Sequence, residues 1–306
     1  GVIQWMLNNA WPSIIWHLYD YYLDPAAGYF GTKKANEPLH ILYGYDDRGV
    51  YVINSTYQDV KGLKAKATVL NFDLTPKFTK EAPVDLAADG VSKALDIPEL
   101  ADLSTTYFVR LELFDAAGKR ASDNFYWLST KPDVYDWAKS SFYNTPVTQH
   151  ADVTMLNQLP KVDLIVTQGR TEHIAAGAKA VLPSQGATVA LPRPAQNITH
   201  VTVKNPSKSL AFMVRLRLLK GGAGTAKNPA TNPGNASSLN PTAAGGDDVL
   251  PIMWDDNYFT LLPGEQREIT ATYAAADLGT AQPVIAVEGW NAVARTVSAT
   301  AKASGK

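Results

Sequence analysis

The sequence predicts a mainly β protein in which two β-sandwiches follow a short βα segment, and three observations lead to this prediction. The chain has 306 residues and 45% of them are hydrophobic, which is sufficient for about two domains of ~100 to 200 residues each. From residue 39 onward, apolar and polar residues alternate in short segments that are separated by turns. The first 45 residues differ from the rest, because they contain 10 of the 30 aromatic residues.

Residues 1–42 are predicted to form the terminal βα segment of a larger domain. Residues 2–7 are a nearly continuous apolar run, as in a strand that is buried on both faces. Residues 26–35 predict a short helix that ends before Pro38. A single βα unit cannot bury itself, because a parallel strand needs neighbouring strands, and the chain offers no second βα repeat.

Residues 43–150 are predicted to form the first sandwich. The turn at 46–49, Asp-Asp-Arg-Gly, separates two apolar segments at 39–45 and 50–54 and predicts a β-hairpin. Further alternating segments lie at 63–72, 106–114 and 124–129. About seven strands fit before residue 130, a pattern that favours an immunoglobulin-like sandwich over a βαβ domain.

Residues 151–306 are predicted to form a second immunoglobulin-like sandwich. Its alternating segments lie at 162–166, 198–203, 210–219, 258–262, 265–273 and 284–287. Residues 221–248 contain hardly any apolar side chains, so we expect a flexible surface loop there. In 261–265, Pro263 and Gly264 predict a turn, and Tyr258 and Phe259 should then lie on opposite faces of the incoming strand.

Composition excludes several classes of function. The chain has 28 Lys and Arg against 29 Asp and Glu, and no basic stretch exceeds Lys33-Lys34, so nucleic acid and anionic membranes are poor partners. The absence of cysteine excludes disulfides, thiolate metal sites and a cysteine nucleophile. No apolar run reaches the ~18 to 20 residues of a membrane helix, and the first residues do not resemble a signal peptide. The five histidines lack metal-ligand spacing, and we predict no metal or other cofactor.

The candidate site lies just beyond the carboxyl end of the predicted first strand. In a (β/α)₈ barrel that end of a strand belongs to the catalytic face. The indole of Trp5 offers a flat apolar surface for a sugar ring, and the amides of Asn8 and Asn9 can donate and accept hydrogen bonds with hydroxyls. We therefore predict substrate binding by Trp5, Asn8 and Asn9. The alternative is that Trp11 and Trp16 are packing residues and that the two asparagines cap a helix.

The first residues resemble a known enzyme family. Residues 1–13, Gly-Val-Ile-Gln-Trp-Met-Leu-Asn-Asn-Ala-Trp-Pro-Ser, together with 16–22, Trp-His-Leu-Tyr-Asp-Tyr-Tyr, resemble barrel strand 8 of glycoside hydrolase family 2. The similarity is greatest to the exo-β-D-glucosaminidase branch. The β-mannosidases of this family usually read Trp-Gln-x-Asn-Asp-x-Trp-Pro at this strand, so Met6 and Asn9 favour a glucosaminidase.

Two later motifs extend the resemblance in the expected order. Residues 29–40, Tyr-Phe-Gly-Thr-Lys-Lys-Ala-Asn-Glu-Pro-Leu-His, resemble the last barrel helix and the entry to the following sandwich. Residues 255–265, Asp-Asp-Asn-Tyr-Phe-Thr-Leu-Leu-Pro-Gly-Glu, resemble the final immunoglobulin-like domain of glucosaminidases and β-mannosidases. The resemblance therefore implies that the last strand and helix of a (β/α)₈ barrel precede the two sandwiches.

The resemblance also implies a reaction. An exo-acting, retaining enzyme of this branch removes terminal β-linked glucosamine from chitosan-like oligosaccharides with two glutamates, which such a mechanism places ~5 to 5.5 Å apart. In the family both glutamates lie on earlier barrel strands, so we expect no catalytic residue in this chain and no activity of the chain alone. The implied partners are the remainder of the catalytic barrel and an amino-sugar oligosaccharide, and the resemblance favours an extracellular or periplasmic location. Asp20, Asp24 and Glu37, the carboxylates before residue 45, are predicted to be solvated or capping residues.

Two alternatives remain open. The protein could be a β-mannosidase of the same family, or a non-catalytic carbohydrate-binding protein of two sandwiches. The second alternative needs an aromatic platform on a sandwich surface, for which Trp127, Trp137, Trp254 and Trp290 are the candidates. We expect most of these four to be core or interface residues. We also expect residues 1–42 to pack against another polypeptide or to remain exposed without one.

Overall fold

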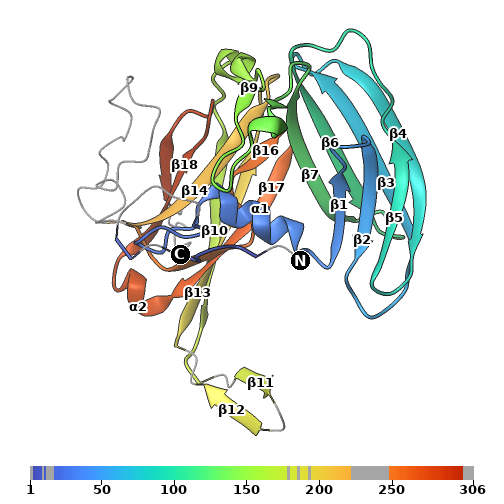
Figure 1. The fold of residues 1–306 in the computed structure, drawn as a ribbon. Coiled ribbons are helices and arrows are strands. Elements are labelled where there is room, and N and C mark those ends of the chain that lie inside the picture. Colours follow the sequence, from blue (N-terminus) through green and yellow to red (C-terminus); the bar gives the residue numbers. More distant parts are fainter. Residues whose placement is uncertain are drawn as a thin grey trace. The chain divides into compact units, whose positions relative to one another are not determined.

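The computed structural model describes residues 3–8, 10–11, 17–177, 180–184, 187–191, 194–221 and 248–298. The chain divides into two compact units, each of which is described by itself: Thr32–Leu159, called here the first unit, and Gly1–Gly31 with Pro160–Lys306, called the second unit. Both units are built almost entirely from antiparallel strands (Figure 1), which confirms the mainly β class. The predicted domain division at residues 42 and 150 stays a prediction.

The first unit is a sandwich of a three-stranded and a four-stranded sheet. The smaller sheet consists, in spatial order, of β1 (Leu39–Tyr43), β2 (Gly49–Asn54) and β5 (Gly90–Asp96). The larger sheet consists of β4 (Pro76–Leu86), β3 (Val60–Asn71), β6 (Thr106–Phe114) and β7 (Arg120–Ser129). Their number agrees with the about seven strands expected before residue 130, although the sequence analysis located only five of them and not β4 or β5.

Alternation along β3 and β6 creates the core of the first unit. On β3, Leu63, Ala65, Ala67 and Val69 are buried, whereas Lys64 and Lys66 between them reach the solvent-facing side. The predicted hairpin is formed by β1 and β2, and Asp47 Oδ1 accepts a hydrogen bond of 2.8 Å from the backbone N–H of Gly49 in its turn. Short-range patterning alone therefore predicts most of this sandwich.

A short extension follows β7 and was not predicted. It contains β8 (Val134–Tyr135), the 3₁₀ helix η1 (Trp137–Lys139), β9 (Val147–Gln149) and the 3₁₀ helix η2 (Thr154–Gln158). β8 and β9 pair with each other in an antiparallel ribbon. The extension is tied to the larger sheet through the carbonyl of Asp152, which accepts hydrogen bonds from Thr106 Oγ1 at 3.2 Å and Ser129 Oγ at 2.8 Å.

The second unit contains a sandwich of two four-stranded sheets. One sheet consists of β10 (Ile165–Ile174), β13 (Gln196–Lys204), β17 (Gln266–Ala274) and β15 (Ile252–Trp254). The other consists of β16 (Phe259–Leu261), β14 (Ala211–Gly221), β18 (Gln282–Glu288) and β19 (Arg295–Ser298). The remaining elements are the short helix α2 (Ala275–Leu278) and a hairpin of β11 (Ala180–Ser184) and β12 (Ala187–Leu191). Nearly all of the predicted loop at 221–248 lies outside the described residues.

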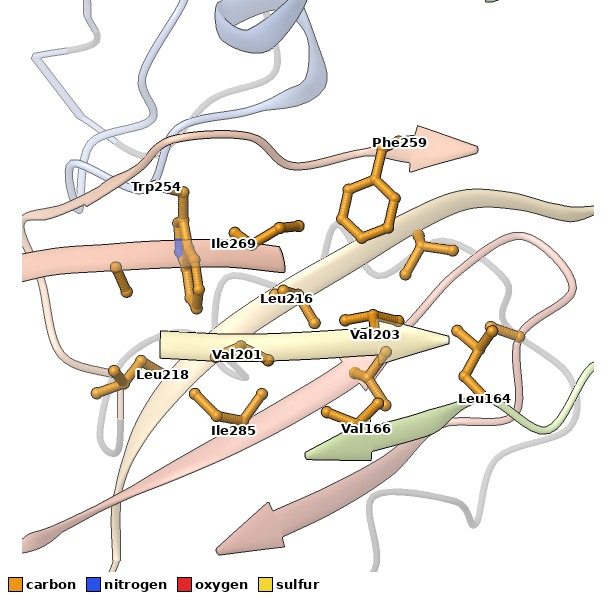
Figure 2. Close-up of a cluster of buried hydrophobic side chains, with 14 of the residues drawn as sticks. Leu164, Val166, Val201, Val203, Leu216, Leu218, Trp254, Phe259, Ile269 and Ile285 are labelled. Carbon is orange, nitrogen blue, oxygen red and sulfur yellow. The ribbon is translucent and has the colours of Figure 1, made fainter. Parts of the chain in front are cut away.

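Side chains from both sheets interlock in the core of the second unit. Figure 2 shows Val201 and Val203 of β13 facing Leu216 and Leu218 of β14, with Trp254 stacked beside them. The turn after β16 has the predicted form, because Gly264 has φ +79° and the N–H of Glu265 donates to the carbonyl of Leu262 at 3.1 Å.

The helix of the predicted βα segment is present, but its strand is not. α1 (Ala27–Ala35) coincides with the predicted helix, and Asn36 Nδ2 donates to the carbonyl of Thr32 at its end. The prediction of a strand at 2–7 is wrong for the described residues 3–7, which have no strand structure. A parallel strand forms only beside neighbouring strands, and Asn8 makes just one isolated parallel bridge, to Tyr19.

Asn291 is a structural residue of the second unit. Its side chain is buried, its Oδ1 accepts from the N–H of Phe212 at 2.9 Å, and its Nδ2 donates to the carbonyls of Pro160 and Leu210, both at 2.7 Å. One side chain thereby joins the start of the second sandwich, the entry to β14 and the loop after β18.

We predict that Asn291→Ala lowers the free energy of unfolding of the second unit by about 3 kcal/mol, because three backbone groups lose a hydrogen-bond partner and two of these bonds are buried. Urea unfolding of the chain measures this effect. Asn157→Ala, at an exposed position of η2, is the matched control and should change stability by less than about 0.5 kcal/mol. Equal effects of the two variants would contradict the prediction.

Candidate functional site

The candidate substrate-binding segment, residues 3–8, is exposed in this chain. Trp5 is 69% exposed and Asn8 is also exposed, so the side chains of both face solvent. Asn9 and Trp16 lie outside the described residues. Trp11 is 69% exposed, so the alternative that it is a packing residue is wrong for this chain. Helix capping by Asn8 is not observed either, because the next described helix is α1, which begins at Ala27.

Backbone hydrogen bonds connect the candidate segment to the residues before α1. The N–H groups of Leu18 and Tyr19 both donate to the carbonyl of Leu7, at 3.1 and 3.3 Å. Tyr19 also bridges to Pro25, and the N–H of Ala26 donates to the carbonyl of Leu18 at 3.2 Å. Three short stretches of chain are thereby held side by side.

The turn at residues 20–24 is organised by one carboxylate. Asp20 Oδ1 accepts hydrogen bonds from the N–H of Tyr22 at 2.8 Å and from the N–H of Asp24 at 3.0 Å. Asp20 is thus a capping residue of a turn, as predicted. This turn fixes the backbone conformation at Asp24 and thereby the orientation of its side chain.

Asp24 anchors the N-terminal residues to the second sandwich. Arg215 Nη2 donates to Asp24 Oδ2 at 2.5 Å, and Arg215 Nη1 donates to Glu288 Oε1 at 2.9 Å. The guanidinium lies 5.7 Å from the ring centroid of Tyr258, which also packs against Phe30 of α1 at 5.9 Å. We call these five residues the Arg215 anchor. The prediction that Asp24 is solvated or capping is wrong, because it belongs to a largely buried ion pair.

Burial determines the direction of the pKa shifts of Asp24 and Tyr258 in the anchor. It raises the pKa of Asp24 above its ordinary value of 3.8, even though the nearby charge of Arg215 acts in the opposite direction. Burial likewise raises the pKa of Tyr258 to about 12, so this phenol stays neutral and can accept the guanidinium on its ring face. An ionised Asp24 is therefore stable here only with Arg215 beside it.

Glu37 links the residues after α1 to β7 within the first unit. Ser122 Oγ donates to Glu37 Oε2 at 2.7 Å, and Lys34 of α1 forms an ion pair of 2.9 Å with Asp123 of β7. Although burial opposes its ionisation, the neighbours His40 and Ser122 lower the pKa of Glu37. The three carboxylates before residue 45 therefore all have structural partners within their own units.

The four tryptophans of the sandwiches differ from one another in burial. Only Trp254 is buried in a core, whereas Trp127, Trp137 and Trp290 are substantially exposed, so the expectation that most of the four are core or interface residues stays a prediction for the last three, which are not core residues. Alternation explains Trp127, because Tyr126 and Leu128 on either side of it pack against the core of the first unit. Trp290 makes an edge contact with Phe212 at 6.4 Å.

The described residues contain no group of three or more His, Asp or Glu side chains that could hold a metal ion. None of the helices in the described part of the chain is long and apolar enough to cross a membrane.

Comparisons with known proteins bear on both units. The family model of the exo-β-D-glucosaminidase Ig-fold domain matches residues 142–242 and 223–292, and that of the mannosidase Ig/CBM-like domain matches 47–131. The exo-β-D-glucosaminidase of Streptomyces avermitilis is 39% identical over 98% of this chain, and that of Amycolatopsis orientalis is 36% identical over 98%. The chain belongs to the exo-β-D-glucosaminidase family.

Solved structures agree with this assignment. A structure of the exo-β-D-glucosaminidase CsxA matches 98% of the chain with a TM-score of 0.78 at 36% identity. The β-D-mannosidase of Dictyoglomus thermophilum, at 14% identity and a TM-score of 0.50, shares the fold. The chain spans 29% of the Streptomyces glucosaminidase and 31% of the CsxA chain, so it corresponds to a part of such an enzyme.

The Arg215 anchor is the part of this glucosaminidase-family chain that the sequence could not reveal. The neighbours of Arg215 along β14 are buried. This alternation predicts only that the side chain of Arg215 points away from the core of the sandwich. Its partner Asp24 is 191 positions away in the sequence, and no local pattern links the two.

We predict that Arg215→Met lowers the free energy of unfolding by about 3 kcal/mol or more, because it leaves the carboxylate of Asp24 buried without its counter-ion. The double variant Asp24→Asn/Arg215→Met should recover much of the loss, since it removes the uncompensated charge. Denaturant unfolding of the two variants and of the wild-type chain measures the difference. A double variant no more stable than Arg215→Met would contradict this account.

The same pair of variants has a predicted pH dependence. Because burial raises the folded-state pKa of Asp24, the folded chain binds its proton more tightly than the unfolded chain. Arg215→Met should therefore become more stable, relative to the double variant, as pH falls from 7 through the raised pKa towards 3.8. Unfolding curves at a series of pH values test this, and a gap that widens towards low pH would contradict it.

Proposed function

We propose that this chain is part of a retaining, exo-acting β-D-glucosaminidase, which removes terminal β-linked glucosamine from chitosan-like oligosaccharides. The observation that carries the proposal is that the similarity to exo-β-D-glucosaminidases extends over 98% of the chain and is not confined to one sandwich. The catalytic glutamates are expected in the part of the enzyme that contains the earlier barrel strands. We further propose that residues 1–42 belong to the end of the barrel in that enzyme, where neighbouring strands would allow residues 2–7 to pair as its last strand ahead of the helix.

Within this proposal, Trp5, Asn8 and Asn9 contact the terminal sugar. The exposed indole of Trp5 has a free face on which the apolar side of a pyranose ring can stack. Asn8 follows Trp5 by three residues, its side chain is exposed, and its backbone is paired with Tyr19 in the same segment. Both side chains are held by backbone that the Arg215 anchor connects to the second sandwich.

A β-mannosidase activity is the second candidate. The mannosidase Ig/CBM-like match to residues 47–131 favours it, but the relatives with mannosidase activity are less similar to this chain. The endo-β-mannosidase of Lilium longiflorum is 23% identical over 95% of the chain, against 31% to 39% for the exo-β-D-glucosaminidases. Side-by-side assays of the complete enzyme on β-glucosaminide and β-mannoside substrates separate the two.

We predict that the 306-residue chain alone does not hydrolyse chitosan oligomers or a chromogenic β-glucosaminide. The retaining mechanism needs a carboxylate nucleophile and a second carboxyl group as proton donor, and both are expected outside this chain. The complete enzyme, assayed in parallel, should be active. Turnover by the chain alone that is lost when one of its own carboxylates is replaced would refute the prediction.

We further predict that Trp5→Ala in the complete enzyme lowers kcat/KM on chitosan oligomers by roughly 2- to 13-fold, which corresponds to about 0.5 to 1.5 kcal/mol of lost stacking. Trp5→Phe should lose less, because it keeps an aromatic face. Trp290→Ala, at an exposed tryptophan of the second sandwich, is the matched control and should leave kcat/KM unchanged. Equal kinetics of wild type and Trp5→Ala would remove Trp5 from the site.

A further inference from the structure

The loop between β8 and β9 in the first unit presents an unusual group of exposed aromatic side chains. We call residues 134–146 the aromatic loop. Phe142 is 94% exposed, Tyr143 92% and Trp137 72%, and Tyr135 is nearly half exposed. Soluble proteins seldom leave contiguous apolar patches of more than a few hundred Å² in water, and each aromatic side chain can bury about 150 to 250 Å².

Internal hydrogen bonds give the aromatic loop a defined shape. The N–H of Asp136 donates to the carbonyl of Pro146 at 2.9 Å, which closes the base of the loop. Ser140 Oγ and Thr145 Oγ1 are hydrogen-bonded at 2.7 Å, and the N–H of Ser141 donates to the carbonyl of Asn144 at 2.8 Å, which closes its tip. The exposure of the aromatic rings is therefore a property of an ordered loop.

The aromatic side chains form two pairs along this loop. The ring centroids of Tyr135 and Trp137 are 5.4 Å apart, and those of Phe142 and Tyr143 are 5.0 Å apart in an edge-to-face arrangement. Tyrosine, tryptophan and phenylalanine are the residues that are enriched in the buried centres of protein interfaces. Such residues on a pre-shaped loop are suited to insertion into a neighbouring protein surface.

The charges of the aromatic loop favour a polypeptide over a chitosan chain as its partner. Its only charged side chains are Asp136 and Lys139, which form an ion pair of 2.9 Å with each other. The loop thus has no net charge with which to attract a cationic amino-sugar polymer. Phe142, which has no polar group to offer a sugar hydroxyl, is the most exposed of the four aromatic residues.

We propose that the aromatic loop docks the first unit onto the barrel-containing part of the complete enzyme. This inference rests on the proposed function in one respect, namely that the chain belongs to a longer enzyme. The chain spans 25% and 29% of the two bacterial glucosaminidases it matches, so most of the length of such proteins lies outside it. That remaining polypeptide is large enough to cover four aromatic side chains.

Hydroxyl-radical footprinting of the 306-residue chain and of the complete enzyme, at equal radical dose, tests the proposal without altering the protein. Trp137, Phe142 and Tyr143 should be labelled strongly in the chain alone and several-fold less in the complete enzyme. Tyr57, which is 98% exposed in the turn after β2, is the comparison within the same unit. Equal labelling of the loop in both proteins overturns the proposal. Protection that appears only when a chitosan oligomer is added also overturns it, and makes the loop a sugar-binding surface.

A pair of substitutions provides the energetic test. Phe142→Ser with Tyr143→Ser should leave the Tm of the chain alone unchanged and lower the Tm of the complete enzyme by several degrees. Tyr57→Ser is the matched control and should leave both unchanged. An unchanged Tm of the complete enzyme overturns the proposal. Activity towards glucosaminides is measured separately, so loop protection in an enzyme without that activity would reject the proposed function and retain the docking surface.

Discussion

The ion pair between Asp24 and Arg215 is the interaction on which the position of the candidate site depends. Residues 3–8 have no sheet of their own in this chain, and they are held by backbone hydrogen bonds to Leu18 and Tyr19. Those residues continue into the turn capped by Asp20, which ends at Asp24. A continuous path of contacts therefore runs from β14 of the second sandwich to the segment that contains Trp5. This path gives the second sandwich a role beyond its own stability, since it fixes the backbone that carries the candidate substrate contacts.

The anchor is specific for its partners because burying the charge of Asp24 is energetically unfavourable without them. Burial opposes the charge of Asp24, and a carboxylate without a well-placed partner would be destabilising at this position. Arg215 meets this requirement with its planar guanidinium, which reaches Asp24 and Glu288 at once and lies over the ring of Tyr258. A lysine has neither the fork nor the flat face to do so. The geometry of the anchor thus restricts how the N-terminal residues can attach to the second sandwich.

The sequence predicted the features that depend on local patterns and missed those that depend on distant partners. Alternation located β3 and β6 because the two-residue period is a property of the strand itself. The strand predicted at 2–7 failed because parallel pairing depends on neighbours, and β15 and β19 were missed because three or four residues show too little alternation. Trp5 and Asn8 could be selected by their chemistry and by family resemblance, whereas Asp24 was misjudged because its partner lies in a distant strand.

Two exposed apolar surfaces point to the same physical conclusion as the comparisons with known proteins. One contains Ile3, Trp5 and Trp11 in the second unit, and the other is the aromatic loop of the first unit. Each unit already has a complete core of its own, so neither surface is needed to stabilise its sandwich. Aromatic and aliphatic side chains that are held on ordered backbone contribute favourable hydrophobic free energy only when they are buried against another surface. The exposure of both surfaces therefore indicates that each unit is shaped for contact with something besides its own core.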